Sequence, residues 1–480
     1  MSTTKRNWIY GVTATVVLIV ILELLLRVGV NLSADYLSQR EEINHDYRLW
    51  QMHLFNTFLG MNEPDPDLFW RLKPNYQNDF INVNSEGFAG PEIAAKQEGE
   101  YRALFLGDST PLGLGLNKAD ESFVRQLEEL LRTRVSDKQI SVVNASVAGY
   151  TSWQCRKQLE KIGEKLQPDL VITYFGNNDP SINGYLSDRE LYEQTRKAGA
   201  ANRILAHSYI YQLLKDVVLG AKERAQAGKQ LKARVPVEEA QENVAAINQW
   251  CISHSAGLII CTVPTPDLWP PGIQFKVFTG DMDSKGRIVM AEEMQGKLNE
   301  QWALCLDTLL LPGQSDQWTQ QVYESSYRDG RSPVEAAAEY QRLLERTPGN
   351  ARLWNNLGVA LWEQGLDADS AFATALALDS LSAIASYNAG IAEYHRDQMR
   401  AEVFLKHAKE LDNYSLRIKS AYNECYRRYG HENGITLADI EPLFSGLAER
   451  EYFVDHCHPT LRGHELIAGE LVEMAAGMVK

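Results

Sequence analysis

The sequence is poor in the features that mark several large protein classes. Its six cysteines are scattered through 480 residues without a Cys-x-x-Cys pair, which argues against a disulfide framework and against a paired-cysteine zinc site. Most of them are expected to be small core residues, although an oxidising compartment would permit an occasional bridge. The six are Cys155, Cys251, Cys261, Cys305, Cys425 and Cys457.

Basic patches are missing as well. The net charge of −15 argues against nucleic acid as a partner, because binding to phosphates needs clustered Lys and Arg. No low-complexity tract stands out, and a composition with 44% hydrophobic and 23% charged residues is that of a globular protein. A chain of this length exceeds one ordinary core, so we expect about two or three domains with an acidic, soluble surface.

The N-terminus contains a long apolar run. Residues 8–22 carry no charge, and apolar character continues past Glu23 and Arg27 to residue 30. Crossing a bilayer takes about 20 helical residues, so the sequence predicts a transmembrane helix over 8–30. Glu23 and Arg27 are one helical turn apart and can pair near the far interface.

The flanks of this run predict its orientation. Lys5 and Arg6 lie in the short tail 1–7, which indicates a cytoplasmic N-terminus and places the rest of the chain in the periplasm or at the cell exterior. A cleaved signal peptide is the alternative, but no convincing A-x-A cleavage site follows. We therefore expect a retained signal anchor that attaches the protein to the membrane.

From residue 101 onward, short apolar runs alternate with helical stretches. This alternation predicts an α/β domain with a parallel sheet and helices on both faces, in which ligands bind beyond the carboxyl ends of the strands. The predicted strands are 103–106, 140–143, 170–175, 258–263 and 435–440, and the predicted helices are 121–134, 153–166, 237–254 and 461–478.

Between residues 318 and 414 the strands stop and approximate repeats take their place. The clearest unit, WNNLGVAL at 354–361, matches the tetratricopeptide pattern of paired helices, and equivalent unit ends fall at 348, 380 and 413. An ordinary helical bundle with accidental spacing is the alternative. Because a strand and a helix of α/β type follow, the repeats are predicted to be an insertion held at both ends.

The predicted organisation divides the chain into consecutive segments. A polar and aromatic stretch with one strand-like alternation at 80–84 is interpreted as a linker or small cap before the α/β domain. The boundaries are 1–7 for the tail, 8–30 for the membrane helix, 31–99 for the linker or cap, 100–312 and 415–480 for the two parts of the α/β domain, and 313–414 for the repeats.

The residues that follow the predicted strands suit acyl transfer. Such chemistry needs a hydroxyl nucleophile, a base that removes its proton, and a carboxylate that orients the base. Ser109 follows the first strand and is the candidate nucleophile. Asp455 and His458 are three residues apart, so on a single turn they can form the orienting hydrogen bond.

An acyl-transfer site also needs donors for the oxyanion of the tetrahedral intermediate. The backbone N–H of Ser109 is one candidate. Gly149 follows the second strand and, having no side chain, lets its own N–H approach closely. Asn178 follows the third strand and adds a side-chain amide.

These blocks resemble the SGNH (GDSL-like) hydrolase superfamily. They occur in the family's order, as Gly107-Asp108-Ser109, Gly149, Gly176-x-Asn178-Asp179 and Asp455-x-x-His458, and the resemblance covers about residues 101–312 and 434–480. It implies a flavodoxin-like three-layer fold and the roles just described. Thr110 stands where the family often has Leu, which leaves the nucleophile unaffected.

Several neighbouring residues have plainer interpretations. His456 and His464 do not fit the block spacing and are expected to be structural or surface histidines. Asp108 is expected to fix its loop by hydrogen bonding. The run 455–458 offers metal-ligand types, but four successive donors cannot converge on one ion, so we expect neither a metal nor another cofactor.

Two further segments leave alternatives open. The charged stretch 188–230 is favoured as a solvated helical hairpin over a lid on the site. The segment 269–271, Trp-Pro-Pro, lies after the fourth strand and either walls an acyl or sugar pocket or packs internally.

The expected function is hydrolysis of carboxylic esters, with O-acyl groups of envelope glycans, lipids or exported polymers as the substrate class. An O-acyltransferase would use the same triad and is the first alternative. A scaffold that binds a protein partner through its repeats, with a silent hydrolase domain, is the second.

Overall fold

The structure is a computed structural model of the chain. It describes residues 3–37, 61–78, 80–184, 186–197, 208, 210–211, 232–269, 271, 332–394, 396–412, 416–445 and 449–479. Some expectations fall on residues outside this description. They concern Cys305, Pro270, most of 198–231, and the parts of the predicted linker, α/β and repeat segments that cover 38–60 and 272–331.

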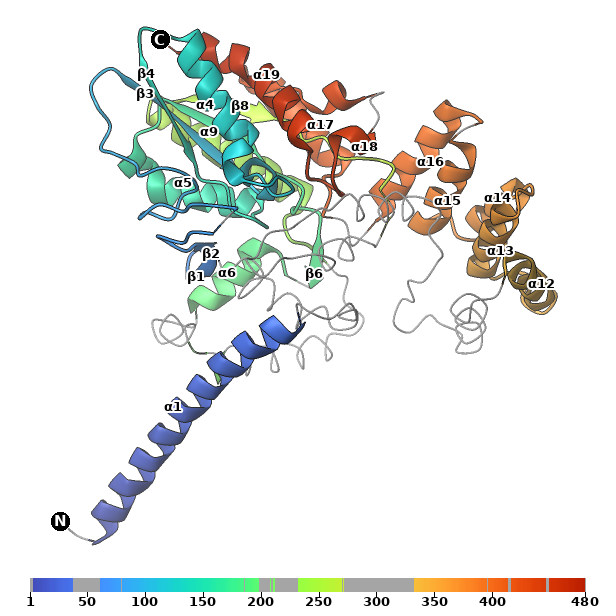
Figure 1. Ribbon diagram of the computed structural model, residues 1–480, viewed down its shortest axis with the longest axis horizontal. Helices are drawn as coiled ribbons and strands as arrows, with labels where there is room; N and C mark the ends of the chain where they lie inside the picture. Colours follow the sequence, from blue (N-terminus) through green and yellow to red (C-terminus); the bar gives the residue numbers. More distant parts are fainter. Residues whose placement is uncertain are drawn as a thin grey trace.

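A five-stranded parallel sheet forms the centre of the α/β domain (Figure 1). Its strands run in the order β4-β3-β5-β8-β9, which is the flavodoxin-like order 2-1-3-4-5. The predicted α/β fold with a parallel sheet is confirmed. The strands are β3 (Glu100–Gly107), β4 (Gln139–Asn144), β5 (Leu170–Tyr174), β8 (Gly257–Cys261) and β9 (Thr436–Ala438).

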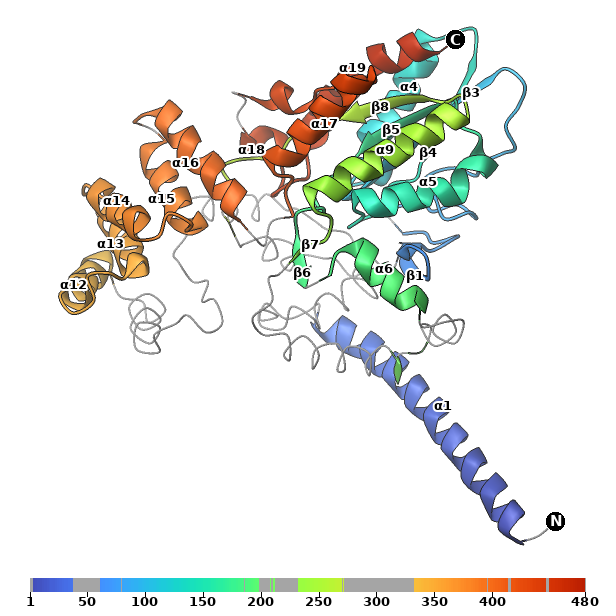
Figure 2. The same cartoon turned by 180° about the vertical axis from the view of Figure 1, so that it is seen from behind.

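The strands form where the sequence has short, almost uniformly apolar runs. β3 and β5 are buried along their whole lengths, as expected for strands covered by helices on both faces. One face carries α4 (Phe123–Arg134) and α19 (Leu461–Met478), which contact each other. The other face carries α5 (Ser152–Leu166), α9 (Val237–Ser253) and α17 (Ser420–Asn433) (Figure 2). The result is a three-layer domain.

Residues 61–99, predicted as a linker or cap, pack against this domain. They contain a hairpin of β1 (Asn62–Asp65) and β2 (Phe69–Leu72), whose Leu68 and Leu72 join the main core. The strand-like alternation at 80–84 makes only isolated bridges, because its partners are single residues in turns.

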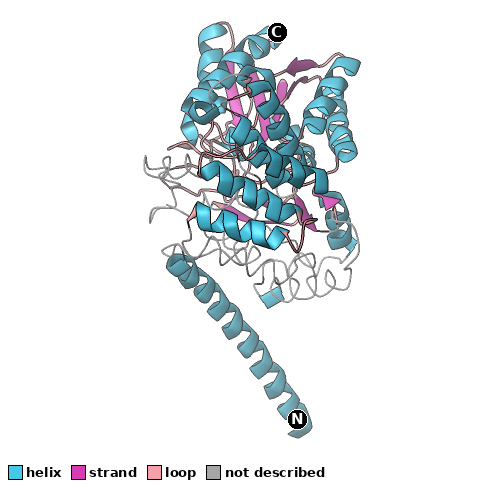
Figure 3. Ribbon diagram, turned by 90° about the vertical axis from the view of Figure 1, so that its right-hand side faces the viewer, coloured by secondary structure: helices cyan, strands magenta, loops and turns pink. Residues whose placement is uncertain are grey.

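The N-terminal helix α1 (Thr3–Leu37) projects away from the other elements (Figures 1 and 3). Its segment Tyr10–Val28 has a mean hydropathy of 2.3 and is not buried inside the protein, so it has the length and composition of a membrane anchor or a signal sequence. Arg27 Nε donates to Glu23 Oε1 at 3.0 Å, as the one-turn spacing predicts.

A helical array lies to one side of the α/β domain and is inserted between β8 and β9 in the sequence (Figures 1 and 2). Each helix packs against the next, and small residues stand where helices cross: a Cβ at Gly390 would lie 2.8 Å from Leu405 Cγ. The helices are α12 (Pro333–Leu344), α13 (Ala351–Glu363), α14 (Asp369–Leu378), α15 (Ala383–Glu393) and α16 (Gln398–Leu411). Membership of the tetratricopeptide class stays a prediction.

Short elements complete the described residues. They are α3 (Ser109–Leu112), η2 (Ala119–Glu121), β6 (Ile182–Gly184), α6 (Asp188–Lys197), β7 (Lys232–Ala233), η3 (Glu441–Phe444) and α18 (Glu449–Tyr452), with β6 and β7 paired antiparallel.

Candidate active site

The turn after β3 presents Ser109 as the first residue of the short helix α3. Asp108 precedes it, and its Oδ1 accepts the Thr110 N–H at 2.9 Å, which confirms that this carboxyl fixes the loop. Gly107 has no room for a side chain, because a Cβ there would lie 2.7 Å from the Tyr174 carbonyl oxygen and would also meet Pro111. Ser109 therefore sits on a tight strand-to-helix turn at the carboxyl edge of the sheet.

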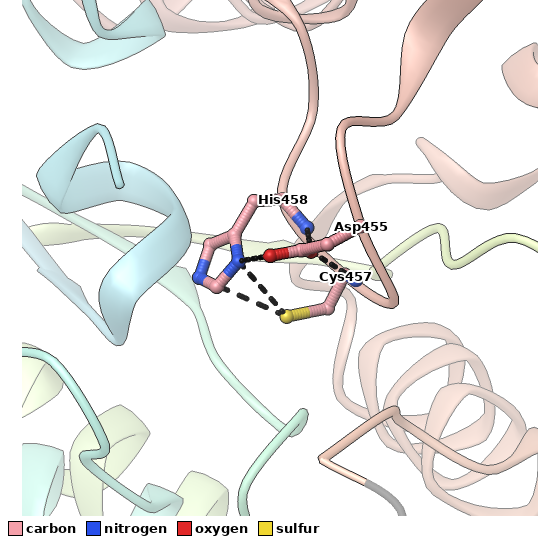
Figure 4. A group of neighbouring side chains, drawn as sticks. All are labelled: Asp455, Cys457 and His458. Atoms are coloured by element: carbon pink, nitrogen blue, oxygen red, sulfur yellow. Dashed lines mark hydrogen bonds and ion pairs between the residues drawn. The ribbon is translucent and has the colours of Figure 1, made fainter. Parts of the chain in front are cut away.

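The turn that holds Asp455 and His458 is built almost entirely from its own residues (Figure 4). Asp455 Oδ1 accepts the backbone N–H groups of Cys457 at 2.9 Å and His458 at 2.8 Å. Its other oxygen, Oδ2, lies 2.7 Å from His458 Nδ1. The carboxylate thus holds both the backbone and the ring of the histidine that follows it.

His458 connects this turn to Ser109. Its Nε2 lies 2.8 Å from Ser109 Oγ, a contact between residues 349 positions apart in the chain. An ionised carboxylate only accepts hydrogen bonds, so His458 Nδ1 carries the proton and Nε2 accepts from the serine hydroxyl. Ser109, His458 and Asp455, each singled out from the sequence, therefore form one continuous hydrogen-bonded chain.

The electrostatics of this chain favour a base that is ready to accept a proton. Burial opposes ionisation of Asp455. The histidines His458 and His456, which are charged at the low pH where Asp455 titrates, outweigh burial together with the hydrogen bonds to the carboxylate. They hold the Asp455 pKa well below its usual range. Burial likewise lowers the pKa of His458, yet the Asp455 carboxylate more than offsets this and raises it above 6.5. Burial raises the pKa of Asp108, beside the nucleophile, to about 6.

The three predicted oxyanion donors lie on the turns that follow neighbouring strands. Among the described residues, no acceptor is found for the backbone N–H of Ser109 or of Gly149. Asn178 Nδ2 donates to the Tyr150 carbonyl at 3.0 Å, which ties this amide to the residue next to Gly149. Gly149 has φ of +79°, a left-handed conformation that favours glycine.

Sequence reasoning missed the residues that hold the Gly149 turn. Arg234, after β7, donates from Nη1 to the Gly149 carbonyl at 2.8 Å, and Trp70 of β2 donates from Nε1 to the Ala148 carbonyl at 3.0 Å. Both lie about 80 positions from the turn, and neither belongs to a recognisable motif. Only the tertiary fold brings them together.

Three of the four candidate donors in the 455–458 run lie close together. One ligand atom each of Asp455, Cys457 and His458 lies within 4.8 Å of the others. Burial raises the pKa of the Cys457 thiol. Both ring nitrogens of His458 are also engaged by Asp455 and Ser109. These residues suit proton transfer better than metal binding.

The remaining sequence candidates are buried and structural. His464 Nδ1 accepts the Phe123 N–H at 3.1 Å, and burial lowers the pKa of His464 to about 3. His456 is buried between Trp269 and His458, at ring distances of 6.2 and 5.7 Å, and burial lowers its pKa to about 4. Both histidines are therefore neutral at pH 7 and neither is on the surface.

Trp269 packs internally. It lies in a cluster with residues of α15 and α16, and the Tyr387 hydroxyl donates to the neighbouring Leu268 carbonyl at 3.0 Å. Arg417, which follows the array, donates to the carbonyls of Pro266 at 3.0 Å and Trp269 at 3.1 Å. The segment after β8 thus fastens the helical array beside the 455–458 turn.

Comparison with known proteins agrees with this geometry. Residues 105–279 match the model of the GDSL-like lipase/acylhydrolase family, a stretch that contains Ser109, Gly149 and Asn178. No curated protein matches the chain.

Among solved structures, a lipase/acylhydrolase from Enterococcus faecalis has 12% identity, with 79% of this chain and 97% of that chain covered and a TM-score of 0.32. An acetylxylan esterase from Geobacillus stearothermophilus has 12% identity, with 78% and 94% covered and a TM-score of 0.32. The family match shows that residues 105–279 form a GDSL-like lipase/acylhydrolase domain within this chain.

Proposed function

We propose that this protein is a membrane-anchored serine esterase that cleaves carboxylic esters through an acyl-Ser109 intermediate. The observation that carries the proposal is the unbroken hydrogen-bonded chain from Ser109 Oγ through both ring nitrogens of His458 to Asp455. Asp455 is ionised at neutral pH, and a neutral His458 ring would bond it through Nδ1 while accepting from Ser109 at Nε2, as nucleophilic catalysis needs.

In the first half of the reaction, Ser109 Oγ attacks the ester carbonyl as its proton moves to His458 Nε2. Positive charge then develops on the ring and is stabilised by the Asp455 carboxylate, 2.7 Å from Nδ1. The carbonyl oxygen becomes an oxyanion, which the N–H groups of Ser109 and Gly149 and the Asn178 amide are in place to receive. Collapse of the intermediate expels the alcohol, which takes the proton from His458.

The second half repeats these steps with water. His458 removes a proton from a water molecule, which attacks the acyl-serine carbonyl, and the same donors stabilise the second oxyanion. The proton then returns from His458 to Ser109 as the carboxylic acid leaves. Asp455 stays ionised throughout, because its pKa lies well below that of the other groups in the site.

The location and substrate class extend the proposal. The apolar segment Tyr10–Val28 supports a single-pass anchor, and Lys5 and Arg6 on its short side support a cytoplasmic N-terminus. The catalytic domain would then face O-acyl or O-acetyl esters on glycans or lipids of the envelope.

The helical array is proposed to bind a protein partner. Its helices stack in sequence order, and exposed apolar side chains occur on it, including Leu381 at 72% and Met399 at 81% exposure. Because α15 and α16 pack against the segment after β8, a bound partner would be kept at a fixed side of the site.

Hydrolysis of p-nitrophenyl acetate by the full chain in detergent tests the proposal. Replacing Ser109 by Ala is expected to lower kcat by roughly 10⁴-fold. Ser253→Ala, on an exposed serine of α9, is the matched control and should keep the wild-type rate. Equal rates for wild type and Ser109→Ala would reject the esterase. Transfer of acetyl to an added glycan in preference to water would instead identify a transferase that uses the same serine.

A further inference from the structure

The direction of the Gly149 N–H is set by a hydrogen bond on the other side of the same peptide group. That group consists of the Ala148 carbonyl and the Gly149 N–H, which point in opposite directions in a planar trans peptide. The Ala148 oxygen accepts the indole N–H of Trp70 at 3.0 Å. Any rotation that turns the Gly149 N–H away from the oxyanion position must therefore break the bond to Trp70.

The next peptide group, between Gly149 and Tyr150, is held at both ends. Its carbonyl accepts from Arg234 Nη1 at 2.8 Å, and its N–H donates to the Val147 carbonyl at 3.1 Å. The two groups differ in one respect. The second has both polar atoms bonded within the protein, whereas the first has its carbonyl bonded and, among the described residues, no acceptor for its N–H. This is the arrangement that an oxyanion donor requires.

Trp70 is itself held firmly. The Tyr150 hydroxyl donates to the Trp70 carbonyl at 2.6 Å, and the Arg234 guanidinium lies 5.6 Å from the Trp70 ring centroid. Arg234 is in turn paired with the buried carboxylate of Asp188 at 2.9 Å. The indole, the guanidinium and the Gly149 turn thus form one contiguous unit.

The backbone that delivers Trp70 is strained. Phe69, the preceding residue, has φ of +67°, which bulky L-residues rarely adopt. Its ring stacks on Trp153 of α5 at 5.4 Å, which holds the conformation in place. Strain of this kind persists where the surrounding structure over-determines it, often at functional positions. In this chain the conformation of Phe69 orients the Trp70 indole toward the Ala148 carbonyl.

We propose that Trp70 is a positioning residue of the oxyanion site, whose indole N–H fixes the Ala148–Gly149 peptide group so that the Gly149 N–H faces the reacting carbonyl oxygen. The proposal rests on the esterase function proposed above. If it holds, the β1–β2 hairpin, which follows the N-terminal segment in the sequence, affects the rate of the chemical step. Trp70 touches no reacting atom and acts only through the peptide group.

Trp70→Phe in the full chain tests this, because phenylalanine keeps an aromatic ring and removes the donor. With p-nitrophenyl acetate, kcat should fall about 10- to 100-fold and KM should change less than about twofold, since the lost stabilisation belongs to the transition state. Affinity for an alkylboronic acid, whose serine adduct is tetrahedral, should fall by a similar factor. Loss of packing alone would not produce this kcat-against-KM pattern.

Trp250→Phe is the matched control, because it makes the same replacement at a partly buried tryptophan of α9, which packs against Gly163 of α5 and stacks on His254. It should leave kcat within about twofold of wild type. If Trp70→Phe does not fold, incorporation of benzothienylalanine at position 70 replaces the indole N–H by sulfur with nearly the same shape. Unchanged kcat in either position-70 variant, or an equal loss in Trp250→Phe, would overturn the proposal. An inactive wild-type protein would instead defeat the esterase function itself.

Discussion

The two sides of the candidate site are held in opposite ways. The base turn, 455–458, makes its key bonds within itself: one carboxylate fixes two backbone N–H groups and the ring that follows. The donor turn around Gly149 is held from a distance, by Trp70 of the hairpin, Arg234 after β7 and Asn178 after β5. One side can form from a few adjacent residues, whereas the other exists only when the whole domain has assembled.

The buried carboxyls on the two sides also differ in charge. Asp455 is paired with His458, and its pKa is held far below the usual range. Asp179, next to Asn178, accepts one backbone N–H from Ser152, and burial raises its pKa to about 7. Asp455 on the base side is therefore fully ionised at neutral pH, whereas Asp179 beside the donor Asn178 is only partly ionised. Less negative charge on Asp179 suits a site that must attract a developing oxyanion.

Asp455→Asn should have the largest effect among the substitutions that leave Ser109 in place. The amide favours the wrong tautomer of His458, so kcat is expected to fall by about 10³- to 10⁴-fold. In the wild type, kcat/KM should rise with pH through the raised pKa of His458, above 6.5, because only the neutral ring accepts the serine proton. Without the Asp455 carboxylate, burial is the main influence on His458 and lowers its pKa. The rise of kcat/KM with pH should therefore occur at lower pH in the variant. Measurement of kcat/KM over pH 5–9 checks this, and an unchanged pH dependence in Asp455→Asn would contradict the pairing of Asp455 with His458.

Asp179→Asn tests the donor side through stability. Because the folded pKa of about 7 lies above the unfolded value near 3.8, this carboxyl destabilises the fold progressively as pH rises from about 4 through 7. At pH 8 the variant is expected to be more stable than wild type by about 3–4 kcal/mol, and at pH 4 the two should converge. Urea unfolding at both pH values measures this, with Asp108 contributing a smaller slope of the same sign to both proteins. If the difference in unfolding free energy between variant and wild type were the same at pH 4 and pH 8, Asp179 would be ionised in the folded protein, which would contradict the raised pKa.

Asn178→Ala removes one oxyanion donor and should lower kcat by about 10²- to 10³-fold with little change in KM. The loss is smaller than that for Asp455→Asn because two backbone donors remain. Steady-state kinetics with p-nitrophenyl acetate separate the two parameters. A rise in KM at constant kcat would mean that Asn178 binds substrate and transition state equally.

Gly149→Ala should show the conformational demand of the donor turn. At φ of +79° an alanine costs about 1–2 kcal/mol of stability. Gly469, in the interior of α19 with open space around it, is the matched control, and Gly469→Ala should stabilise the protein by about 0.5–1 kcal/mol. Thermal unfolding compares them, and shifts of the same sign would contradict the left-handed turn.

The difference between the two sides also explains what could be predicted from sequence. The sheet strands, the main helices and the candidate residues of the base turn follow from patterns that span a few residues, and the structure places Asp455, His458 and Ser109 together. Trp70 and Arg234 could not be found in this way, because each meets the donor turn only through tertiary packing. The hairpin that carries Trp70 falls in the segment predicted as a linker or small cap, because four-residue strands give too short a pattern to recognise.

Labelling of Ser109 tests the central claim most directly. The full chain in detergent is treated with a fluorophosphonate, which reacts with activated serines, and the adduct is located by peptide mass spectrometry. The proposed mechanism predicts a single adduct on Ser109, absent in Ser109→Ala and formed at least about 10²-fold more slowly in His458→Ala, which lacks the base. An adduct on another residue, or labelling at an equal rate in His458→Ala, would contradict it.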